Sequence, residues 1–548
     1  MNQNSPPPIG KLLKDSKLIT EEHIQFALVE QKATGERMGE CLMRLGLVTD
    51  SQLAKVLASQ AGMPFIDLSA FMPDPEVLAM IPANMARQKQ VLPLWQKDGK
   101  LHIAVPDPYD HSPADAVFRF TGVAPKIHVG AANQLKKLIE RFYYLLEHPI
   151  EERINEVTAN LKANPSADVD VDTLITHLLA EAISLRATDV HISPSEISSR
   201  INFRIDGVMR LAHVLSASIH PRLVANIKVK AGMDISEKRK PQDGRMRFEF
   251  LGDEFDIRVS TVRSSSGENV VMRLLGAGSS SVVLGDIGFE GDQFRLIKNL
   301  LSKPHGIFLV TGPTGSGKTT TLYAALRAQD VIQKNIVTIE DPIEIEFSMI
   351  RQTQVNIKAG YTFASAIRTF LRQDPDVILV GEIRDEETAV MATRAALTGH
   401  LVLSTLHANS AAGALARLSD LGISRYLMST ALIGVMAQRL FRKLCVRCRQ
   451  RYEPDSNEKE ALNLPDEGTY YRAVGCKDCS NTGYLGRMAV AEVLPLTNRI
   501  SELIAADASI HEIEKEARRD GFYDLFEAGR KKVISGETSI DEFVRVLG

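Results

Sequence analysis

Apolar and polar positions follow three patterns along the chain. The first 60 residues hold apolar positions at helical spacing in two copies 29 residues apart, so that Gly10 recurs as Gly39. Residues 173–275 alternate apolar with polar residues, which predicts strands that bury one face. From Gly306 onward, short apolar runs alternate with helical segments. This last pattern predicts an α/β domain with a parallel sheet between layers of helices.

Shorter features set the boundaries between these regions. Residues 63 to about 145 mix short strands with helical stretches, and a charged segment that ends in N-P-S-A-D-V-D-V-D predicts a linker. The tail after Ile500 has the pattern of amphipathic helices. We therefore expect an N-terminal regulatory or docking domain (1–150), a linker (151–172) and a small α/β domain (173–275). An α/β core (276–440), a cysteine-bearing insert (441–495) and a C-terminal helical subdomain (496–548) should follow.

Composition and charge exclude several classes of protein. The 548 residues are 44% apolar and 24% charged, as in ordinary globular proteins. A formal net charge of −3 gives no sign of nucleic-acid binding. The N-terminus, M-N-Q-N-S-P-P-P, lacks the features of a signal peptide, and no apolar run reaches the roughly 18 residues of a membrane span. We expect a cytoplasmic protein whose association with a membrane is peripheral.

One loop carries a strong chemical motif. G-P-T-G-S-G-K-T, residues 312–319, lies between an apolar run and a helical segment and fits the P-loop pattern. Its glycines let backbone N–H groups converge on phosphate oxygens, and the following helix adds partial positive charge. Lys318 is expected at the β- and γ-phosphates and Thr319 at Mg²⁺. The predicted contacts with ATP and Mg²⁺ are Gly312, Pro313, Thr314, Gly315, Ser316, Gly317, Lys318, Thr319 and Thr320.

Acidic residues and an imidazole follow three further predicted strands of this domain. The run I-V-T-I-E-D-P-I-E contains Glu340 and Glu344, V-I-L-V-G-E places Glu382 after a glycine, and L-V-L-S-T-L-H ends at His407. Ligands of open α/β sheets bind at the carboxyl ends of the strands, so we expect these side chains at the nucleotide. Glu382 stands one residue later than the Asp that often serves Mg²⁺. The sequence alone leaves open whether Glu344 or Glu382 handles the attacking water.

Four of the five cysteines form two C-x-x-C pairs. Cys445 and Cys448 make the first pair, and Cys476 and Cys479 make the second. In a reducing compartment, four thiolates at this spacing favour a tetrahedral Zn²⁺ site. Redox chemistry is the alternative, but the N-T-G-Y-L-G-R that follows favours a structural site. Cys41 falls in the apolar repeat and is predicted to pack in a core.

These motifs resemble those of the secretion ATPases of type II secretion and type IV pilus assembly, the GspE and PilB type. The resemblance covers most of residues 170–548 and is carried by G-P-T-G-S-G-K-T, T-I-E-D-P-I-E, V-G-E-I-R-D and T-G-H-L-V-L-S-T-L-H-A-N, with F-R-I-D-G-V, K-P-Q-D-G-R and V-V-M-R-L-L upstream. It implies a RecA-like core, a PAS-like small α/β domain and a homohexameric motor at the cytoplasmic face of the inner membrane. Such a motor drives pilin or pseudopilin assembly through an integral-membrane platform protein. Assembly members of the family carry a tetracysteine insert, whereas retraction members lack it.

The resemblance also implies roles for single acidic residues. Glu344 would act as the base and Glu382 would serve the metal, with Glu340 and His407 beside them. Mutating Glu344 should then remove turnover, whereas mutating Glu382 should change the dependence on Mg²⁺.

Arginines of the small α/β domain are expected at the nucleotide phosphates by the same resemblance. D-x-R-V-S-T and V-V-x-R-L-L assign this role to Arg258 and Arg273, with Arg204 as a third candidate. A guanidinium can hold phosphate oxygens with two parallel hydrogen bonds.

The N-terminal copies resemble a second family, the MshEN-type domains that bind cyclic-di-GMP. Residues 37–60 match its 24-residue motif at nearly every position, and residues 8–31 match it except that Pro8 replaces the opening Arg and Lys17 replaces a Gly. The resemblance implies cyclic-di-GMP contacts at Gly10, Gln31, Arg37, Gly39 and Gln60. The alternative is a helical docking module whose leucines only form a core.

The expected function is ATP hydrolysis that drives pilus or pseudopilus assembly under control of cyclic-di-GMP. A P-loop DNA translocase or helicase is the competing enzyme, but the near-neutral charge and the lack of a basic, aromatic-rich groove argue against it. A nucleotide-binding scaffold without activity is hard to reconcile with intact P-loop, acidic and histidine motifs. The sequence does not distinguish a pilus from a secretion pseudopilus.

Overall fold

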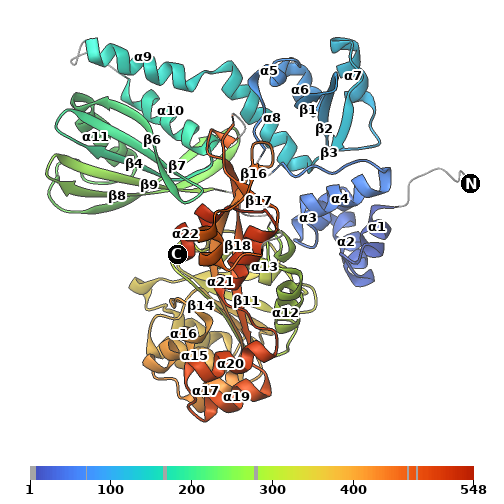
Figure 1. The fold of residues 1–548 in the computed structure, drawn as a ribbon, viewed down its shortest axis with the longest axis vertical. Coiled ribbons are helices and arrows are strands. Elements are labelled where there is room, and N and C mark those ends of the chain that lie inside the picture. The colour runs from blue at the N-terminus through green and yellow to red at the C-terminus, as the bar shows by residue number, and fades with distance from the viewer. Residues whose placement is uncertain (1–7, 69–70, 164–169, 277–281, 466–467, 477–478) are drawn as a thin grey trace, which may run out of the picture. The chain divides into compact units, whose positions relative to one another are not determined.

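The computed structural model describes residues 8–548 apart from 69–70, 164–169, 277–281, 466–467 and 477–478. The chain divides into two compact units, residues 1–56 with 281–548 and residues 57–280, and each unit is described by itself (Figure 1). Among the described residues, no helix is both long enough and apolar enough to cross a membrane.

A seven-stranded sheet forms the centre of the first unit. Its order is β12-β11-β13-β14-β10-β15-β18, and neighbours are parallel except for the antiparallel pair β15 and β18. The strands are β10 Gly306–Thr311, β11 Ile336–Glu340, β12 Arg351–Gln354, β13 Val377–Val380, β14 Leu401–Leu406, β15 Leu432–Leu444 and β18 Tyr484–Pro495. Every residue of β10, β11, β13 and β14 is buried, which explains their continuous apolar runs. The predicted parallel α/β core is confirmed.

Helices cover both faces of this sheet. Successive residues of β10 point to opposite faces, so Ile307 and Leu309 join one apolar core while Phe308 and Val310 join the other. The first core includes residues of α14 to α17, and the second includes residues of α12 and α13. These helices are α12 Gly291–Leu301, α13 Lys318–Arg327, α14 Phe363–Phe370, α15 Glu386–Leu397, α16 Ala411–Asp420 and α17 Arg425–Ala431. Because helices cover both faces of the sheet, the ends of its strands are where a ligand can reach it.

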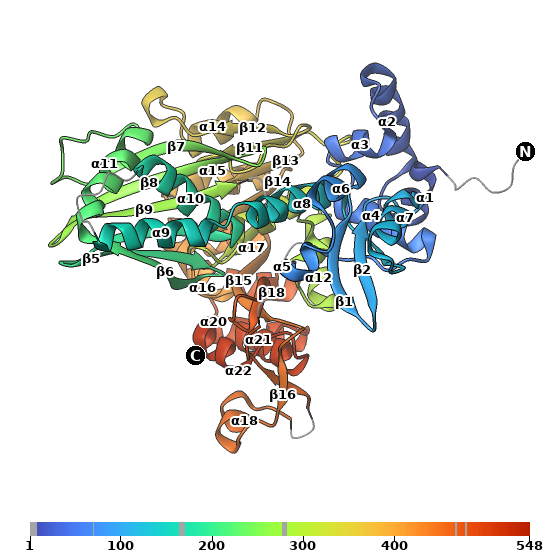
Figure 2. The same ribbon diagram turned by 90° about the horizontal axis from the view of Figure 1, so that it is seen from above.

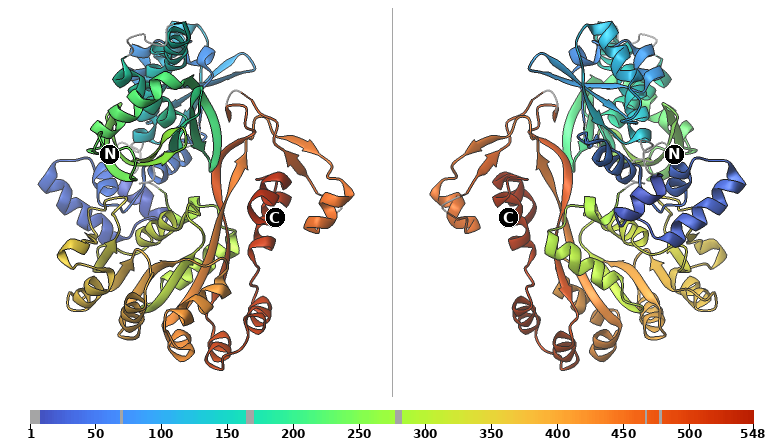
Figure 3. Two further views of the ribbon diagram at one scale, coloured as in Figure 1. Left: turned by 90° about the vertical axis from the view of Figure 1, so that its left-hand side faces the viewer. Right: turned by 90° about the vertical axis from the view of Figure 1, so that its right-hand side faces the viewer.

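The two longest strands of the sheet carry the cysteine-bearing segment. β15 has 13 residues and β18 has 12. Between them lie β16 Gln450–Tyr452, α18 Ser456–Leu462 and β17 Tyr470–Arg472, which Figures 2 and 3 show at the far end of this hairpin. The insert expected at 441–495 therefore begins and ends within strands of the core sheet, and only residues 445–483 lie outside those strands.

The C-terminal tail forms the amphipathic helices that its pattern predicts. They are α19 Asn498–Ala505, α20 Ile510–Arg519, α21 Leu525–Ile534 and α22 Ile540–Leu547. In α22 the fully buried carboxylate of Glu542 pairs with Arg442 of β15 at 2.7 Å and with Arg545 at 2.6 Å. Burial alone would raise the pKa of Glu542, but hydrogen bonds from Arg545 and Arg442 hold it below its usual value. This ion pair attaches the tail to the strand that leads to the cysteines.

The N-terminal residues of the first unit fold as the repeat predicts. Two short helices, α1 Ile9–Asp15 and α2 Glu21–Thr34, recur at the 29-residue step as α3 Met38–Arg44 and α4 Asp50–Ala61. Their shared apolar core contains Cys41, which is fully buried. The prediction that Cys41 packs in a core is confirmed.

The second unit contains two sheets. The smaller has the order β1-β2-β3 and packs with helices α5 to α8. Its elements are β1 Leu92–Lys97, β2 Lys100–Val105, β3 Lys126–Val129, α5 Pro75–Leu78, α6 Ala83–Lys89, α7 Ser112–Thr121 and α8 Ala132–Glu147.

The larger sheet is antiparallel throughout, with the order β6-β5-β4-β9-β8-β7. Its strands are β4 Ala187–Pro194, β5 Ser198–Ile205, β6 Val208–Ser216, β7 Gln242–Phe250, β8 Asp253–Ser264 and β9 Gly267–Gly276. Helices α10 Val171–Ser184 and α11 His220–Lys230 share its apolar core (Figure 1). Asp206 and Gly207 form the turn between β5 and β6 with positive φ, in agreement with the predicted hairpin.

Most of the segment expected to be a linker is helical. Helix α9 covers Ile150–Ala163, and only residues 164–169 of the expected linker lie outside the described residues. Ile150 and Ile154 are buried in the core of the larger sheet. Two apolar residues one turn apart are enough to hold a mostly polar helix against a core, which the composition of the segment does not reveal.

Candidate functional site

The P-loop joins the carboxyl end of β10 to the first turn of α13. Gly317 precedes this helix with φ of 86°, a conformation that glycine adopts without strain. The Lys318 ammonium donates to the carbonyl oxygens of Gly312 at 2.8 Å and Pro313 at 3.1 Å, so it curls over the loop. Burial lowers the pKa of Lys318, although the nearby Glu382 opposes the shift. Free N–H groups at a helix start and a cation above them make an anion-binding loop.

Two threonine hydroxyls hold the neighbouring strand ends together. The Thr311 hydroxyl lies 2.9 Å from the carbonyl oxygens of Leu406 and Ala408 and accepts from the Ala408 N–H at 2.7 Å. On the other side of β14, the Thr405 hydroxyl donates to the carbonyl of Gly381 at 2.8 Å. These bonds place the segments that follow β10, β14 and β13 side by side.

Glu382 and His407 meet at this edge of the sheet, as the sequence predicts. His407 Nε2 lies 3.6 Å from Glu382 Oε2, and Arg384 pairs with the other carboxylate oxygen of Glu382 at 2.5 Å. The Glu382 side chain is only 13% exposed, whereas that of His407 is 53% exposed. Glu382 is therefore an oriented carboxylate close to Lys318, and His407 is the more accessible of the two.

Glu340 and Glu344 differ in their surroundings. Glu340 is buried, and its carboxylate accepts hydrogen bonds from Thr338 at 2.7 Å, from Gln352 at 3.1 Å and from Tyr323. Glu344 lies on the exposed loop after β11. The structure thus gives Glu340 an anchoring position and leaves Glu344 at the surface of the site.

Tyr323 links these two glutamates, and sequence reasoning missed it. Its hydroxyl donates to Glu340 and accepts from the backbone N–H of Glu344 at 3.1 Å. Burial and the contact with Glu340 raise its pKa, so the hydroxyl keeps its proton. Tyr323 lies on α13 five residues after Lys318, where a buried aromatic residue is ordinary. No local signal in the sequence distinguishes it.

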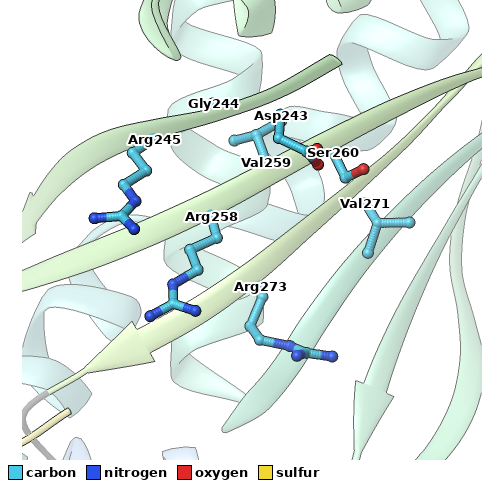
Figure 4. A pocket seen from close by; sticks show the side chains of 8 residues that line it. All are labelled: Asp243, Gly244, Arg245, Arg258, Val259, Ser260, Val271 and Arg273. Carbon is cyan, nitrogen blue, oxygen red and sulfur yellow. The ribbon is translucent and has the colours of Figure 1, made fainter. Parts of the chain in front are cut away.

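Three arginines line one face of the larger sheet in the second unit. Arg245 of β7, Arg258 of β8 and Arg273 of β9 are direct partners in the strand register. They border a pocket of about 470 Å³, together with Asp243, Gly244, Val259, Ser260 and Val271 (Figure 4). Among the described residues, the buried Nε of Arg258 has no hydrogen-bond partner. The face therefore offers a group of cationic donors to a phosphate-bearing ligand.

Arg204 lies beyond Asp189 in the same register row and outside the pocket lining, whereas the structure adds Arg245 to the group. Arg204 donates to the carbonyl of Gly207 at 3.1 Å and lies 3.6 Å from Asp189, which also pairs with Arg273 at 3.0 Å. Arg204 is absent from the pocket lining. Arg245 belongs to K-P-Q-D-G-R, and the hairpin pattern could have placed it opposite Arg258.

The four cysteines of the two C-x-x-C pairs come together, as predicted. Their sulfur atoms all lie within 4.8 Å of one another, with Cys445 to Cys476 at 3.9 Å and Cys448 to Cys479 at 3.7 Å. A tetrahedral Zn²⁺ with Zn–S bonds of ~2.3 Å sets its thiolates ~3.8 Å apart. Burial would raise the pKa of Cys479, but N–H groups of Cys476 and Gly483 at 3.2 Å lower it to about 7. The thiols therefore fit a tetrahedral metal ion.

The residues of the predicted cyclic-di-GMP motif occupy several environments. A Cβ on Gly10 would lie 3.6 Å from Ile24, and one on Gly39 would lie 3.2 Å from Leu53, so these glycines admit close helix packing. Gln31 donates to the carbonyl of Glu36 at 3.0 Å and closes the turn between the copies.

The remaining two motif residues differ in exposure. Arg37 is exposed at the start of α3, and Gln60 has a buried Oε1 without a hydrogen-bond partner among the described residues. Arg37 is thus the one charged residue among the five predicted contacts, and its exposed side chain is accessible to an anionic ligand.

Two protein-family models match parts of the chain. The model of the family "Type II/IV secretion system protein" matches residues 165–545, and the MshEN domain model matches residues 61–148. The MshEN match does not include the two helical copies before residue 61.

Similar curated proteins extend over nearly the whole chain. The type IV pilus assembly ATPase PilB of Myxococcus xanthus is 38% identical over 555 residues, which cover 98% of each chain. Type II secretion system protein E of Xanthomonas campestris pv. campestris is 37% identical over 552 residues, with 97% and 96% covered. Among solved structures, the Legionella pneumophila ATPase DotB is 21% identical with a TM-score of 0.50, covering 68% of this chain and 95% of that one, a likeness of fold.

We expect the full-length protein, purified under reducing conditions without added metal, to hold one Zn²⁺ per chain in elemental analysis. The double variant Cys448→Ser/Cys479→Ser should lose the metal and unfold at a lower temperature, because a structural zinc site contributes folding energy. Cys41→Ala, which alters a buried cysteine outside the cluster, is the control and should keep the zinc. Reduced wild-type protein without metal would contradict the assignment.

Proposed function

The chain belongs to the type II/IV secretion system protein family of secretion ATPases, and we propose that it is a homohexameric motor whose ATP hydrolysis drives assembly of a pilus or pseudopilus. The observation that carries the proposal is the meeting of the P-loop, Glu382 and His407 at one edge of the sheet, beside the loop of Glu344. This edge has the parts that phosphoryl transfer to water requires.

The proposed chemistry assigns one task to each group. Backbone N–H groups at the start of α13 and the Lys318 ammonium hold the phosphate oxygens of ATP and balance the charge that develops on them. Glu344 orients the attacking water and accepts its proton as the oxygen bonds to the γ-phosphorus. The bond to the β-phosphate oxygen breaks, and ADP and phosphate leave.

Glu382 and Thr319 are the residues proposed to hold Mg²⁺. Arg384 and His407 orient the Glu382 carboxylate, and burial keeps it close to Lys318. When bound, Mg²⁺ would withdraw negative charge from the phosphate oxygens of ATP. Glu340 then acts as an anchor for the loop of Glu344 through Tyr323.

The arginine face of the second unit is proposed to contact nucleotide phosphates. Arg258 and Arg273 were expected there from the motifs, and Arg245 shares their register and pocket. Arginine donors in such positions stabilise the transferred phosphoryl group during hydrolysis. Arg204 is occupied with Gly207 and Asp189 and is a weaker fit to this role.

The partners proposed for the motor are based on the family and on the segment that bears the four cysteines, here called the zinc segment. The tetracysteine cluster supports an assembly motor over a retraction motor. We propose attachment to the cytoplasmic face of the inner membrane through an integral-membrane platform protein, with the N-terminal region and the zinc segment as the contacts. We expect no nucleic-acid partner, because the formal net charge is −3.

Cyclic-di-GMP is proposed as a regulator that binds the N-terminal copies. The exposed Arg37 at the start of α3 supports binding of a phosphate or a guanine edge. Pro8 stands at the matching place before α1, so the first copy lacks this cation. Gly10 and Gly39 contribute by letting the helices of each copy pack closely.

Glu344→Gln should bind Mg-ATP with unchanged affinity and lose turnover about 100-fold or more, because an amide cannot accept the proton of water. Phosphate release and nucleotide titration of the full-length protein measure both. Glu346→Gln, a change of an exposed glutamate on the same loop, is the matched control. Unchanged turnover in Glu344→Gln would contradict its role as base.

Glu382→Gln should raise the Mg²⁺ concentration that gives half-maximal activity, since an amide binds the hydrated ion less strongly than a carboxylate. A Mg²⁺ titration of phosphate release detects this. If Glu382→Gln depended on Mg²⁺ as the wild type does, Glu382 would not be part of the metal site. The role of Glu344 as the base would not be affected by that result.

Calorimetry with cyclic-di-GMP on the full-length protein tests the proposed regulator. Arg37→Ala should weaken binding about tenfold or more through loss of a charge-assisted hydrogen bond. Lys32→Ala, which removes an exposed cation from the spacer between the copies, should bind normally. The absence of binding at tens of micromolar ligand, or undiminished binding by Arg37→Ala, would refute the site.

A further inference from the structure

A buried glutamine on β15 contacts the P-loop from the neighbouring strand. Gln438 is 1% exposed. Its Nε2 donates to the carbonyl oxygen of Ser316 at 2.7 Å, and its Oε1 accepts from the Thr321 hydroxyl at 2.8 Å. Ser316 belongs to the loop, whereas Thr321 belongs to α13. One side-chain amide therefore connects the loop to the helix that follows it.

Two glycines of the loop pack against the same residue. A Cβ on Gly312 would come within 2.6 Å of the backbone carbonyl oxygen of Gln438, and one on Gly317 would come within 2.8 Å of its Nε2. Both glycines have positive φ, 146° and 86°. Any larger residue at either position would meet both backbone strain and a collision with Gln438. The loop therefore packs closely against both the backbone and the side chain of Gln438.

The strand fixes the position of Gln438. The preceding residue, Ala437, is level with Thr311 at the end of β10. Arg439 donates to the Gln438 carbonyl at 3.1 Å and to the carbonyl of Asn409, the last residue of the histidine motif, at 3.0 Å. If the Gln438 side chain turned away, the Ser316 carbonyl and the Thr321 hydroxyl would lose their partner in a buried place, which is costly.

We propose that Gln438 is a positioning residue of the nucleotide site, which holds residues 312–318 in the conformation that binds phosphate. The inference rests on the proposed assignment of this loop to ATP. Gln438 acts through Ser316 and Thr321 and makes no contact with the nucleotide itself. Its loss should therefore weaken nucleotide affinity more than it slows the chemical step.

Calorimetry with Mg-ADP on the full-length protein tests this role. Gln438→Met keeps the length of the side chain but removes both hydrogen bonds, so the Kd for ADP should rise about tenfold. The KM for ATP should rise with it, while kcat falls less than about threefold. Thr321→Val removes one of the two bonds and should raise the Kd about threefold. The double variant Gln438→Met/Thr321→Val should have the same Kd for ADP as Gln438→Met alone, because both changes remove the same contact.

Gln293→Met is the matched control. Gln293 is also a buried glutamine of the first unit, and its Nε2 donates to the carbonyl of Ala491 on β18 at 2.6 Å. This variant should lose comparable thermal stability and keep wild-type affinity for ADP. An equal loss of ADP affinity in Gln293→Met would overturn the proposal, since the effect would then be one of general stability.

Lys318→Ala distinguishes a failure of the nucleotide-site assignment from a failure of the role proposed for Gln438. If the loop is the nucleotide site, this variant should bind ADP at least about tenfold more weakly; retained binding would overturn the site assignment and the role of Gln438 with it. Weak binding by Lys318→Ala together with unchanged affinity in Gln438→Met overturns the role of Gln438 alone. Should Gln438→Met fail to fold, unchanged affinity in Thr321→Val has the same consequence.

Discussion

The parallel register of four adjacent strands is the constraint on which the proposed site depends. Thr311 of β10 is level with Leu406 of β14, and Val380 of β13 is level with Ser404 of β14 and with Ile339 of β11. All four strands therefore end at nearly the same height. The P-loop after β10, His407 after β14, Glu382 after β13 and Glu344 after β11 all lie within a few residues of that height. A shift of one strand by one residue would move each of its side chains into the opposite apolar core, so the packing of the two cores fixes the register and with it the site.

Local features of the sequence predicted the parts of this site, and only long-range pairing joins them. Continuous apolar runs identify buried parallel strands, and the glycine pattern before Lys318 identifies the loop and the helix start, because each depends on neighbouring residues. Gln438 and Thr321 are 117 residues apart in the chain and meet only because β15 pairs with β10. Tyr323 is likewise an ordinary helix residue until β11 places Glu340 against it. Gln438 and Tyr323, which support the site, therefore escaped prediction because their partners lie far away in the sequence.

Two features outside the core show how the same residue types serve packing. Gly10 and Gly39, at the start of α1 and α3, are predicted ligand contacts, and each also lies against an apolar side chain of the next helix, Ile24 or Leu53. The charged segment after residue 150 suggested a linker, but Ile150 and Ile154 hold it as a helix against an apolar core. In both cases the deciding contact is with another element, which a pattern along the chain does not specify. The four cysteines are the opposite case, since their spacing alone predicted a cluster with sulfur atoms at metal-binding separation.

The central claim is that ATP is hydrolysed where the parallel strands end. Steady-state phosphate release from Mg-ATP, measured for the full-length wild type and for Lys318→Ala at equal oligomer concentration, tests it most directly. The account predicts turnover by the wild type and a loss of about 100-fold or more in Lys318→Ala, because this ammonium is the cation assigned to the phosphates. Hydrolysis by Lys318→Ala at the wild-type rate would contradict it.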